Sequence, residues 1–215
     1  MDIVIAGGHG KIALLTAKLL SGEGHTARSL IRNPGHEADV VAAGAHPVVA
    51  DMEQLEAEQL TALVRGADAV VFAAGAGPGS GSDRKWTVDY GAAVKLIEAA
   101  KGAGIDRYVM ISARGADPDA PDDGGFNTYL RAKGQADADL QASGLGYTII
   151  RPVGLTDDPA SNAVSTADDG AETIPRADVA AVVVAVLSEP RTAGLTFPLR
   201  SGSETIAAAI ESLLR

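Results

Sequence analysis

The sequence predicts a doubly wound α/β fold built on a parallel sheet of about seven strands. Two observations carry this prediction: short β-branched runs alternate with longer Ala- and Leu-rich stretches, and glycines follow most of the longer stretches. Such alternation is typical of right-handed βαβ units, and glycine is favoured just beyond a helix end. We therefore expect the strand order 3-2-1-4-5-6-7.

The expected elements follow one another in a regular order. The strand candidates are Asp2–Ala6, Thr26–Ile31, His46–Ala50, Ala69–Ala73, Arg107–Ile111, Tyr147–Ile150 and Leu195–Leu199. The helix candidates are Lys11–Ser21, His36–Ala43, Glu53–Val64, Arg84–Ala103, Gly125–Ser143, Arg176–Ser188 and Ser203–Leu214. The chain of 215 residues shows no linker long enough to separate two domains, so we expect a single domain over 1–215.

The composition excludes several kinds of site and partner. There is no cysteine, which rules out disulfides, zinc–thiolate sites and thiol nucleophiles, and the 4 histidines lack metal-ligand spacing, so we expect no metal. A net charge of -10 repels phosphate polymers and anionic membrane surfaces, which argues against nucleic-acid and membrane partners. No apolar run reaches the roughly 18 residues that span a bilayer. With no targeting segment at the N-terminus, we expect a cytoplasmic protein.

Three polar or glycine-rich loops follow the carboxyl ends of expected strands, where doubly wound folds bind their ligands. They span 75–82, 117–125 and 155–172. Loops of this length inside a compact domain tend to be lids or binding loops. We expect the three loops to form the substrate side of the protein.

The first strand runs directly into a glycine-rich turn that has the features of a phosphate-binding site. The residues of the turn are Gly7, Gly8, His9, Gly10, Lys11, Ile12 and Ala13. Glycines at this spacing let the backbone approach a diphosphate, and the helix that follows supplies free N–H groups and a partial positive charge. The pattern therefore predicts a nicotinamide dinucleotide site. The alternative is a glycine-rich turn in an α/β protein that binds no dinucleotide.

The ends of the second and third strands favour NADP(H) over NAD(H). Arg32 stands at the end of the second strand, directly after Ile31, with no acidic residue beside it in the sequence, and an arginine suits a ribose 2′-phosphate. Asp51 and Met52 follow the third strand, where the adenine should lie. The alternatives are that Arg32 is simply solvated and that Asp51 is an ordinary turn residue.

Tyr129, Lys133 and Ser112 form a candidate catalytic set. Tyr129 and Lys133 lie four residues apart in an expected helix, on one face. An adjacent ammonium favours the phenolate, so we expect Lys133 to lower the pKa of Tyr129 from its reference value near 10. Lys133 could also hold the nicotinamide ribose, and Ser112 could bond the substrate carbonyl. The alternative is a half-buried tyrosine that packs on the sheet beside a solvated lysine.

Together these segments resemble the atypical short-chain dehydrogenases/reductases of the NAD(P)H-binding, NmrA-like and epimerase-like kind. The matching segments are IVIAGGHGKIA, SLIRNP, VVFAAGAG, WTVDYGAAVKLIEAAKGAGIDRYVMISARGA, YLRAKGQADADLQASGLGYTIIRPVGLTDDP and IPRADVAAVVVAVL, and they cover nearly the whole chain. The resemblance implies a Rossmann fold, and it implies roles for further residues. Ala73, Ala74 and Gly75 match the turn beside the adenosine, and Pro152, Val153 and Gly154 match the segment that closes over the nicotinamide.

The sequence also departs from the family pattern at two places. The stretch from Ser112 to Tyr129 is longer than usual, and Asp89 stands where the family often has an active-site asparagine. Our leading hypothesis is an NADP(H)-dependent oxidoreductase acting on a small carbonyl, quinone or flavin-like acceptor. A second hypothesis is a redox-sensing regulator that binds NADP(H) and acts through a protein partner. A third is a nucleotide-sugar epimerase, although little chain remains for a sugar-binding lobe. A homodimer and a regulatory partner both stay open.

Overall fold

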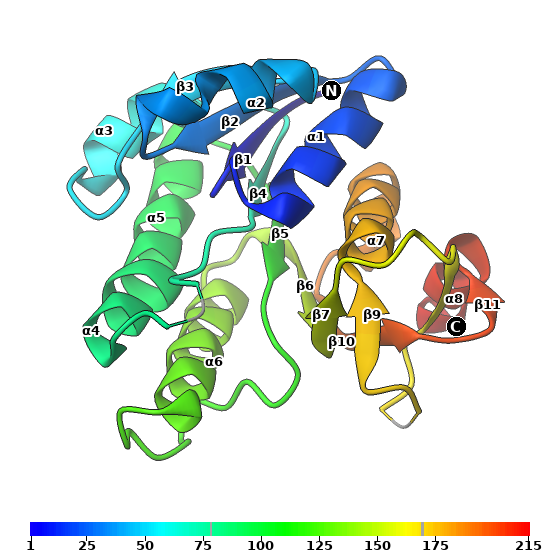
Figure 1. Cartoon of the computed structure of the whole chain (residues 1–215). Helices are drawn as coiled ribbons and strands as arrows, with labels where there is room; N and C mark the ends of the chain where they lie inside the picture. Colours follow the sequence, from blue (N-terminus) through cyan, green and yellow to red (C-terminus); the bar gives the residue numbers. More distant parts are fainter. Residues whose placement is uncertain (78, 169) are drawn as a thin grey trace.

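A sheet of nine strands forms the centre of the computed structural model, which describes residues 1–77, 79–168 and 170–215 (Figure 1). The strands lie in the order β11-β8-β10-β6-β5-β4-β1-β2-β3. Their bounds are β1 Asp2–Ala6, β2 Thr26–Ile31, β3 His46–Val49, β4 Ala69–Phe72, β5 Arg107–Ile111, β6 Gly146–Pro152, β8 Ala163–Ser165, β10 Leu195–Ser201 and β11 Glu204–Thr205.

The seven predicted strands are present, and their predicted order is confirmed. From β3 to β10 each pair of neighbours runs parallel, as the βαβ alternation predicts. The predicted number of strands was too low, because β8 and β11 extend the sheet beyond β10 in antiparallel pairing. Each has three residues or fewer, which is too short for the period-two pattern that marks a strand in a sequence.

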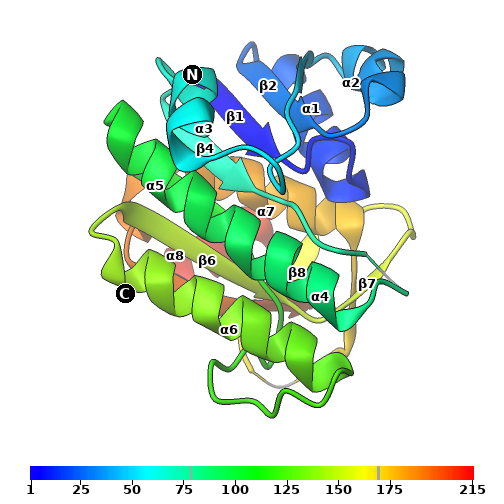
Figure 2. The ribbon, with the colours of Figure 1, turned by 90° about the vertical axis from the view of Figure 1, so that its left-hand side faces the viewer.

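Helices cover both faces of the sheet (Figures 1 and 2). On one face lie α1 Lys11–Gly22, α2 Glu37–Ala42, α7 Arg176–Ser188 and α8 Ile206–Leu213, and on the other lie α3 Ala57–Val64, α5 Ala93–Ala103 and α6 Phe126–Ala142. The side chains of β1 alternate between the two layers: Ile3 and Ile5 belong to the core under α1 and α7, whereas Val4 belongs to the core under α3 and α5. Because such strands are buried on both faces, their sequences are continuous apolar runs.

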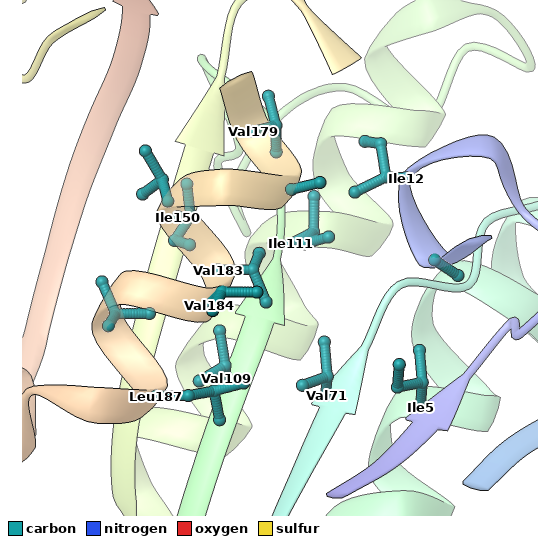
Figure 3. Close-up of a cluster of buried hydrophobic side chains, with 14 of the residues drawn as sticks. Ile5, Ile12, Val71, Val109, Ile111, Ile150, Val179, Val183, Val184 and Leu187 are labelled. Carbon is teal, nitrogen blue, oxygen red and sulfur yellow. The ribbon is translucent and has the colours of Figure 1, made fainter. Parts of the chain in front are cut away.

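Helix α7 is apolar over most of its surface because it lies on the middle of the sheet. Val183 and Leu187 of α7 pack above Val109 and Ile150, which project from β5 and β6 (Figure 3). Both strands lie near the centre of the sheet, where α1 is the neighbour of α7. The burial of these branched aliphatic side chains fixes α7 and, with it, the segment that precedes it.

Four predicted helices differ from the observed ones in type or by more than one residue at an end. The helix expected over 203–214 begins at Ile206, because Thr205 belongs to β11 and caps the helix by accepting a hydrogen bond from the Ala208 N–H. The helix expected over 53–64 begins at Ala57, because Glu56 and Gln59 form a capping box there. The one expected over 84–103 consists of α4 Ser82–Arg84, a π-helical segment η2 Lys85–Ala92, and α5. The stretch expected to be helical over 36–43 begins with a 3₁₀ turn, η1 Pro34–His36. Another 3₁₀ turn, η3 Pro190–Thr192, precedes β10.

The segment 155–172 is more regular than expected. A second, two-stranded sheet joins β7 Gly154–Thr156 to β9 Thr173–Pro175, and β8 also lies in this segment. Residues 78 and 169, which belong to the loops predicted over 75–82 and 155–172, lie outside the described residues. Among the helices that the structure describes, none is both long enough and apolar enough to cross a membrane.

Candidate functional site

The glycine turn brings the backbone of three strands close together. Gly7 has φ +76°, and a Cβ atom there would lie 2.6 Å from Cα of Ala74. A Cβ at Gly8 would lie 2.4 Å from Cβ of Ser29 on β2. Both distances are far below contact, so only glycine fits at either position. The turn is closed by the Gly10 N–H, which donates to the Gly7 carbonyl over 2.8 Å.

Helix α1 begins at Lys11 with free backbone donors. Gly10 caps it without a side-chain hydrogen bond, and the first N–H with an intrahelical acceptor is that of Leu14. Within the described residues, the N–H groups of Lys11, Ile12 and Ala13 have no acceptor. These donors and the positive end of the helix dipole suit an anionic group. The residues present therefore fit the diphosphate of a dinucleotide.

Two polar side chains of the turn are engaged with neighbouring elements. His9 Nε2 lies 2.8 Å from Asp39 Oδ2 on α2, and the His9 ring stacks on His36 with centroids 3.6 Å apart. Lys11 forms an ion pair with Asp157, which also binds Arg176 Nη1 over 2.7 Å. The pair connects the glycine turn to the segment after β7. The side chain of Ile12, by contrast, is buried and lines the second of the cavities described below.

A first cavity of about 360 Å³ lies between the glycine turn and the ends of β2 and β3. Nine of the predicted cofactor residues line it. Four belong to the turn, Gly7, Gly8, His9 and Gly10, and the other five are Arg32, Asp51, Met52, Ala74 and Gly75. Arg32 is more than half exposed, and its Nη1 donates to Glu53 Oε2 over 3.2 Å. The sequence shows no acid beside Arg32, but folding supplies one. Asp51 accepts a hydrogen bond from the Glu53 N–H over 3.0 Å.

A second cavity, of about 650 Å³, adjoins the first and shares Ala74 and Gly75 with it. The three predicted catalytic residues, Ser112, Tyr129 and Lys133, all line this cavity, as does Ala73. The cavity is also lined by Lys85, Phe126 and Arg176, for which no sequence motif predicted a role. Phe126 is the most exposed of the large apolar side chains, and only its position at the start of α6 in the fold reveals that it borders a cavity.

Lys133 is buried and its ammonium group is held on the sheet side of α6. Its Nζ donates to the Ile111 carbonyl over 3.0 Å and lies 3.7 Å from Asp89 Oδ1. Asp89, from the π-helical segment, also accepts a hydrogen bond from the Ala76 N–H over 3.2 Å. Burial raises the pKa of Asp89, whereas the charge of Lys133 acts in the opposite direction. Asp89 thus joins Lys133 to the loop after β4.

The expectation that Lys133 lowers the pKa of Tyr129 is wrong for this structure. Burial raises the pKa of Tyr129 above its usual value, and the negative charges of Asp89 and Asp137 raise it further. The ammonium of Lys133 faces Asp89 and the Ile111 carbonyl instead. Tyr129 is therefore a neutral phenol at physiological pH, and such a group can donate a proton but cannot accept one.

Ser112 is bound to Asp137, an acid that is not among the predicted site residues. Its Oγ donates to Asp137 Oδ2 over 2.8 Å, and Arg151 Nε donates to the same oxygen over 2.9 Å. Asp137 is buried, and burial raises its pKa. Tyr129, Lys133 and Asp137 are spaced by four residues on α6, so all three lie on one face. This spacing was the signal that could have identified Asp137.

A third cavity, of about 710 Å³, lies beyond Ser112 and Tyr129. Pro152 and Val153, which were expected at the nicotinamide, line this cavity and not the second one. Arg114 also lines it and donates to Glu172 over 2.8 Å. Of the loops predicted to form the substrate side, 75–82 borders the second cavity and 155–172 borders the third, whereas 117–125 contributes Gly125 to the second.

The strand order, the glycine turn and the two joined cavities define a Rossmann-type dinucleotide-binding protein. A model of the NAD(P)H-binding family matches residues 7–190. The chain belongs to this family. No group of three or more metal-binding side chains occurs in the part of the chain that the structure describes.

Individual relatives agree with this assignment. A Bacillus subtilis protein named as an uncharacterized sugar epimerase is 39% identical over 99% of this chain and 100% of its own. The structure of a putative NAD-dependent epimerase/dehydratase from Bacillus halodurans superposes with a TM-score of 0.91, at 33% identity and 99% coverage of both chains. An oxidoreductase from Lactococcus lactis superposes with a TM-score of 0.86, at 26% identity, and covers 100% of this chain and 97% of its own. These similarities extend over nearly the whole chain and agree with its membership of the NAD(P)H-binding family.

Proposed function

We propose that this protein is an NADP(H)-dependent reductase that transfers hydride to a small carbonyl, quinone or flavin-like acceptor. One observation carries the proposal. Ser112, Tyr129 and Lys133 line a single cavity that continues, through Ala74 and Gly75, into the cavity at the glycine turn. An acceptor and the reactive end of a dinucleotide could therefore meet beside an acid, a cation and a hydroxyl group. An NAD(P)H azoreductase from Xenophilus azovorans, 27% identical over 96% of this chain and 72% of its own, supports a reductase.

The cofactor would be held by elements at the carboxyl edge of the sheet. The free N–H groups at the start of α1 would bind the diphosphate, and Arg32 would bind the 2′-phosphate. Lys133 would bond the nicotinamide ribose, as the resemblance implies. When bound, the nicotinamide supplies the hydride. The remaining cofactor contacts in this proposal are Gly7, Gly8, His9, Gly10, Lys11, Ile12, Asp51, Met52, Ala73, Ala74, Gly75, Pro152 and Val153.

Tyr129 is the proton donor in this proposal. Reduction of a carbonyl adds a hydride to carbon and a proton to oxygen, and the phenol of Tyr129 gives that proton to the oxygen. The raised pKa of Tyr129 keeps the donor protonated at neutral pH. The product of the transfer is a phenolate, and solvent then restores its proton.

Ser112 positions the acceptor. It lies at the border of the second and third cavities, so a group bound to it faces Tyr129. Its hydroxyl proton is directed to Asp137 in this structure. The hydroxyl oxygen is thus available to accept a hydrogen bond from an acceptor molecule that carries an N–H or O–H group.

The test is oxidation of NADPH followed at 340 nm with panels of carbonyls, quinones, flavins and azo dyes. We expect turnover with at least one class and loss of turnover in Tyr129→Phe. Thermal shift with NADPH and NADH provides the binding control, since a ligand at 100 times its Kd should stabilise the fold by about 2.7 kcal/mol. Stabilisation by NADPH without turnover in any panel would contradict the reductase and favour a redox-sensing regulator. Conversion of a nucleotide sugar without net NADPH consumption would favour an epimerase.

A further inference from the structure

Glu53 lies at the adenosine end of the first cavity and binds two arginines from different segments. Its Oε2 accepts hydrogen bonds from Arg32 Nη1 over 3.2 Å and from Arg84 Nη2 over 3.1 Å. Its Oε1 accepts a hydrogen bond from Thr87 Oγ1 over 2.6 Å. Arg32 directly follows β2, Glu53 follows β3, and Arg84 ends α4. Three remote segments thus converge on one carboxylate.

This carboxylate is ionised at neutral pH. The hydrogen bond from Thr87 lowers the pKa of Glu53; partial burial opposes this effect, and the hydrogen bond and charge of Arg84 and the charge of Arg32 lower the pKa further. The Glu53 side chain is 20% exposed, less than either arginine. Two guanidinium groups around one carboxylate form an anion site that the chain itself fills.

The position of this anion site coincides with the place where doubly wound folds read the ribose. The 2′ substituent of the adenosine is recognised just after the second strand, where an acid bonds a hydroxyl group and an arginine accommodates a phosphate. Arg32, Glu53 and Arg84 line the same cavity as the glycine turn. A 2′-phosphate and the Glu53 carboxylate would need the same guanidinium groups, and the two anions would repel each other.

We infer that Glu53 determines the cofactor selectivity of this protein: its carboxylate competes with a 2′-phosphate for Arg32 and Arg84, and it accepts a hydrogen bond from the 2′-hydroxyl of NAD(H). Arg84 is the second arginine of the phosphate site. This inference rests on the proposed binding of the 2′-phosphate at Arg32. It assigns the balance between the two cofactors to one side chain that lies 21 residues beyond that arginine.

The test measures the Kd values of NADPH and NADH by calorimetry for the wild type and for Glu53→Gln. Glutamine keeps the shape of the side chain and an acceptor for Thr87 but removes the charge. We expect the Kd of NADPH to fall by about three- to tenfold, while the Kd of NADH stays the same or rises. The change should shrink in high salt, because both arginines are exposed. Glu58→Gln, which removes an exposed charge from the neighbouring helix, should change neither value.

Arg84→Gln is the second variant. It should weaken NADPH binding about as much as Arg32→Gln does, without affecting NADH. An unchanged ratio of the two Kd values in Glu53→Gln, or normal NADPH binding in Arg84→Gln, would overturn the inference even if the wild type binds and oxidises NADPH. If the wild type binds neither nucleotide, the proposed function itself fails. Circular dichroism and thermal melting check that each variant is folded.

Discussion

The hydroxyl group of Ser112 donates its proton to Asp137, over 2.8 Å, inside the core between α6 and the sheet. The two residues are 25 positions apart in the chain. Arg151 binds the same carboxylate oxygen, so the direction of the hydrogen bond is fixed as long as Asp137 is ionised. Ser112 therefore cannot donate to a substrate carbonyl without giving up a charge-assisted hydrogen bond.

Replacement of Asp137 by asparagine should free Ser112 for the substrate. A neutral acceptor holds the serine proton less tightly, so we expect the KM of a carbonyl acceptor to fall about three- to fivefold. The variant should also be less stable by roughly 1–3 kcal/mol, because Arg151 loses its charged partner. Steady-state kinetics and urea unfolding measure the two effects. The exposed Asp139→Asn on the same helix is the control, and an equal KM in both variants would argue against a positioning role.

Tyr129→Phe should abolish the proton donor and leave the cofactor site intact. General acid catalysis contributes about 10²–10⁴-fold, so we expect kcat to fall by this factor. The affinity for NADPH should stay within about twofold, because the glycine turn lies on other elements. Turnover at the wild-type rate in this variant would show that the proton comes from another group.

The raised pKa of Tyr129 has a consequence for stability at alkaline pH. The folded protein keeps the Tyr129 proton at pH values where the unfolded chain loses it, so this contribution is present below pH 10 and is lost as the pH rises further. Above pH 10 the wild type should lose up to about 1.4 kcal/mol per pH unit more than Tyr129→Phe does. Burial also raises the pKa of Tyr108. Because Tyr108 is present in both proteins, its contribution cancels in the difference between them. Urea unfolding at pH 9 and pH 11 measures the difference, and parallel losses would contradict the shift.

Gly7→Ala should damage both the fold and the cofactor site. The positive φ of Gly7 disfavours a side chain, and the new Cβ would meet the Ala74 backbone at 2.6 Å. We expect a loss of about 1–3 kcal/mol in the free energy of unfolding and at least a tenfold weaker NADPH affinity. Gly22→Ala is the control, because the structure describes no atom within 4 Å of a Cβ there and alanine favours the helix. Normal NADPH binding by a folded Gly7→Ala protein would mean that the turn does not hold the diphosphate.

Gly134 explains how the long stretch between Ser112 and Tyr129 is accommodated. A Cβ at Gly134 would lie 2.2 Å from the Asp117 carbonyl carbon, so this loop rests directly on the backbone of α6. Gly134→Ala should push the loop away and cost about 1–3 kcal/mol, although alanine is the better helix former. Thermal melting of Gly134→Ala, with Gly22→Ala as the control variant, measures this change in stability. A stabilised Gly134→Ala protein would show that the loop is free to move.

The local features of this protein could be predicted from short stretches of sequence. The parallel strands and their order follow from the alternation of apolar runs with helical segments, and the turn at Gly7 and Gly10 follows from the strand-to-helix step. The turn depends on residues close in the chain, whereas the strand order depends on the topology that right-handed βαβ units favour. The edge strands β8 and β11 could not be predicted, because two or three residues carry no periodicity and their pairing depends on the already folded edge at β10.

The sequence by itself determined the α/β fold, the glycine turn and the helix face that carries Tyr129 and Lys133. The tertiary structure alone decided the ionic and hydrogen-bond partners of the site residues. Glu53 binds Arg32, and Asp137 accepts the hydrogen bond of Ser112. The ammonium group of Lys133 lies beside Asp89 and not, as expected, beside the phenol of Tyr129. The physical reason is that periodicity and turn chemistry act within a few residues. The pKa of a side chain and the direction of its hydrogen bond depend instead on charges and burial that remote segments supply only when the chain has folded.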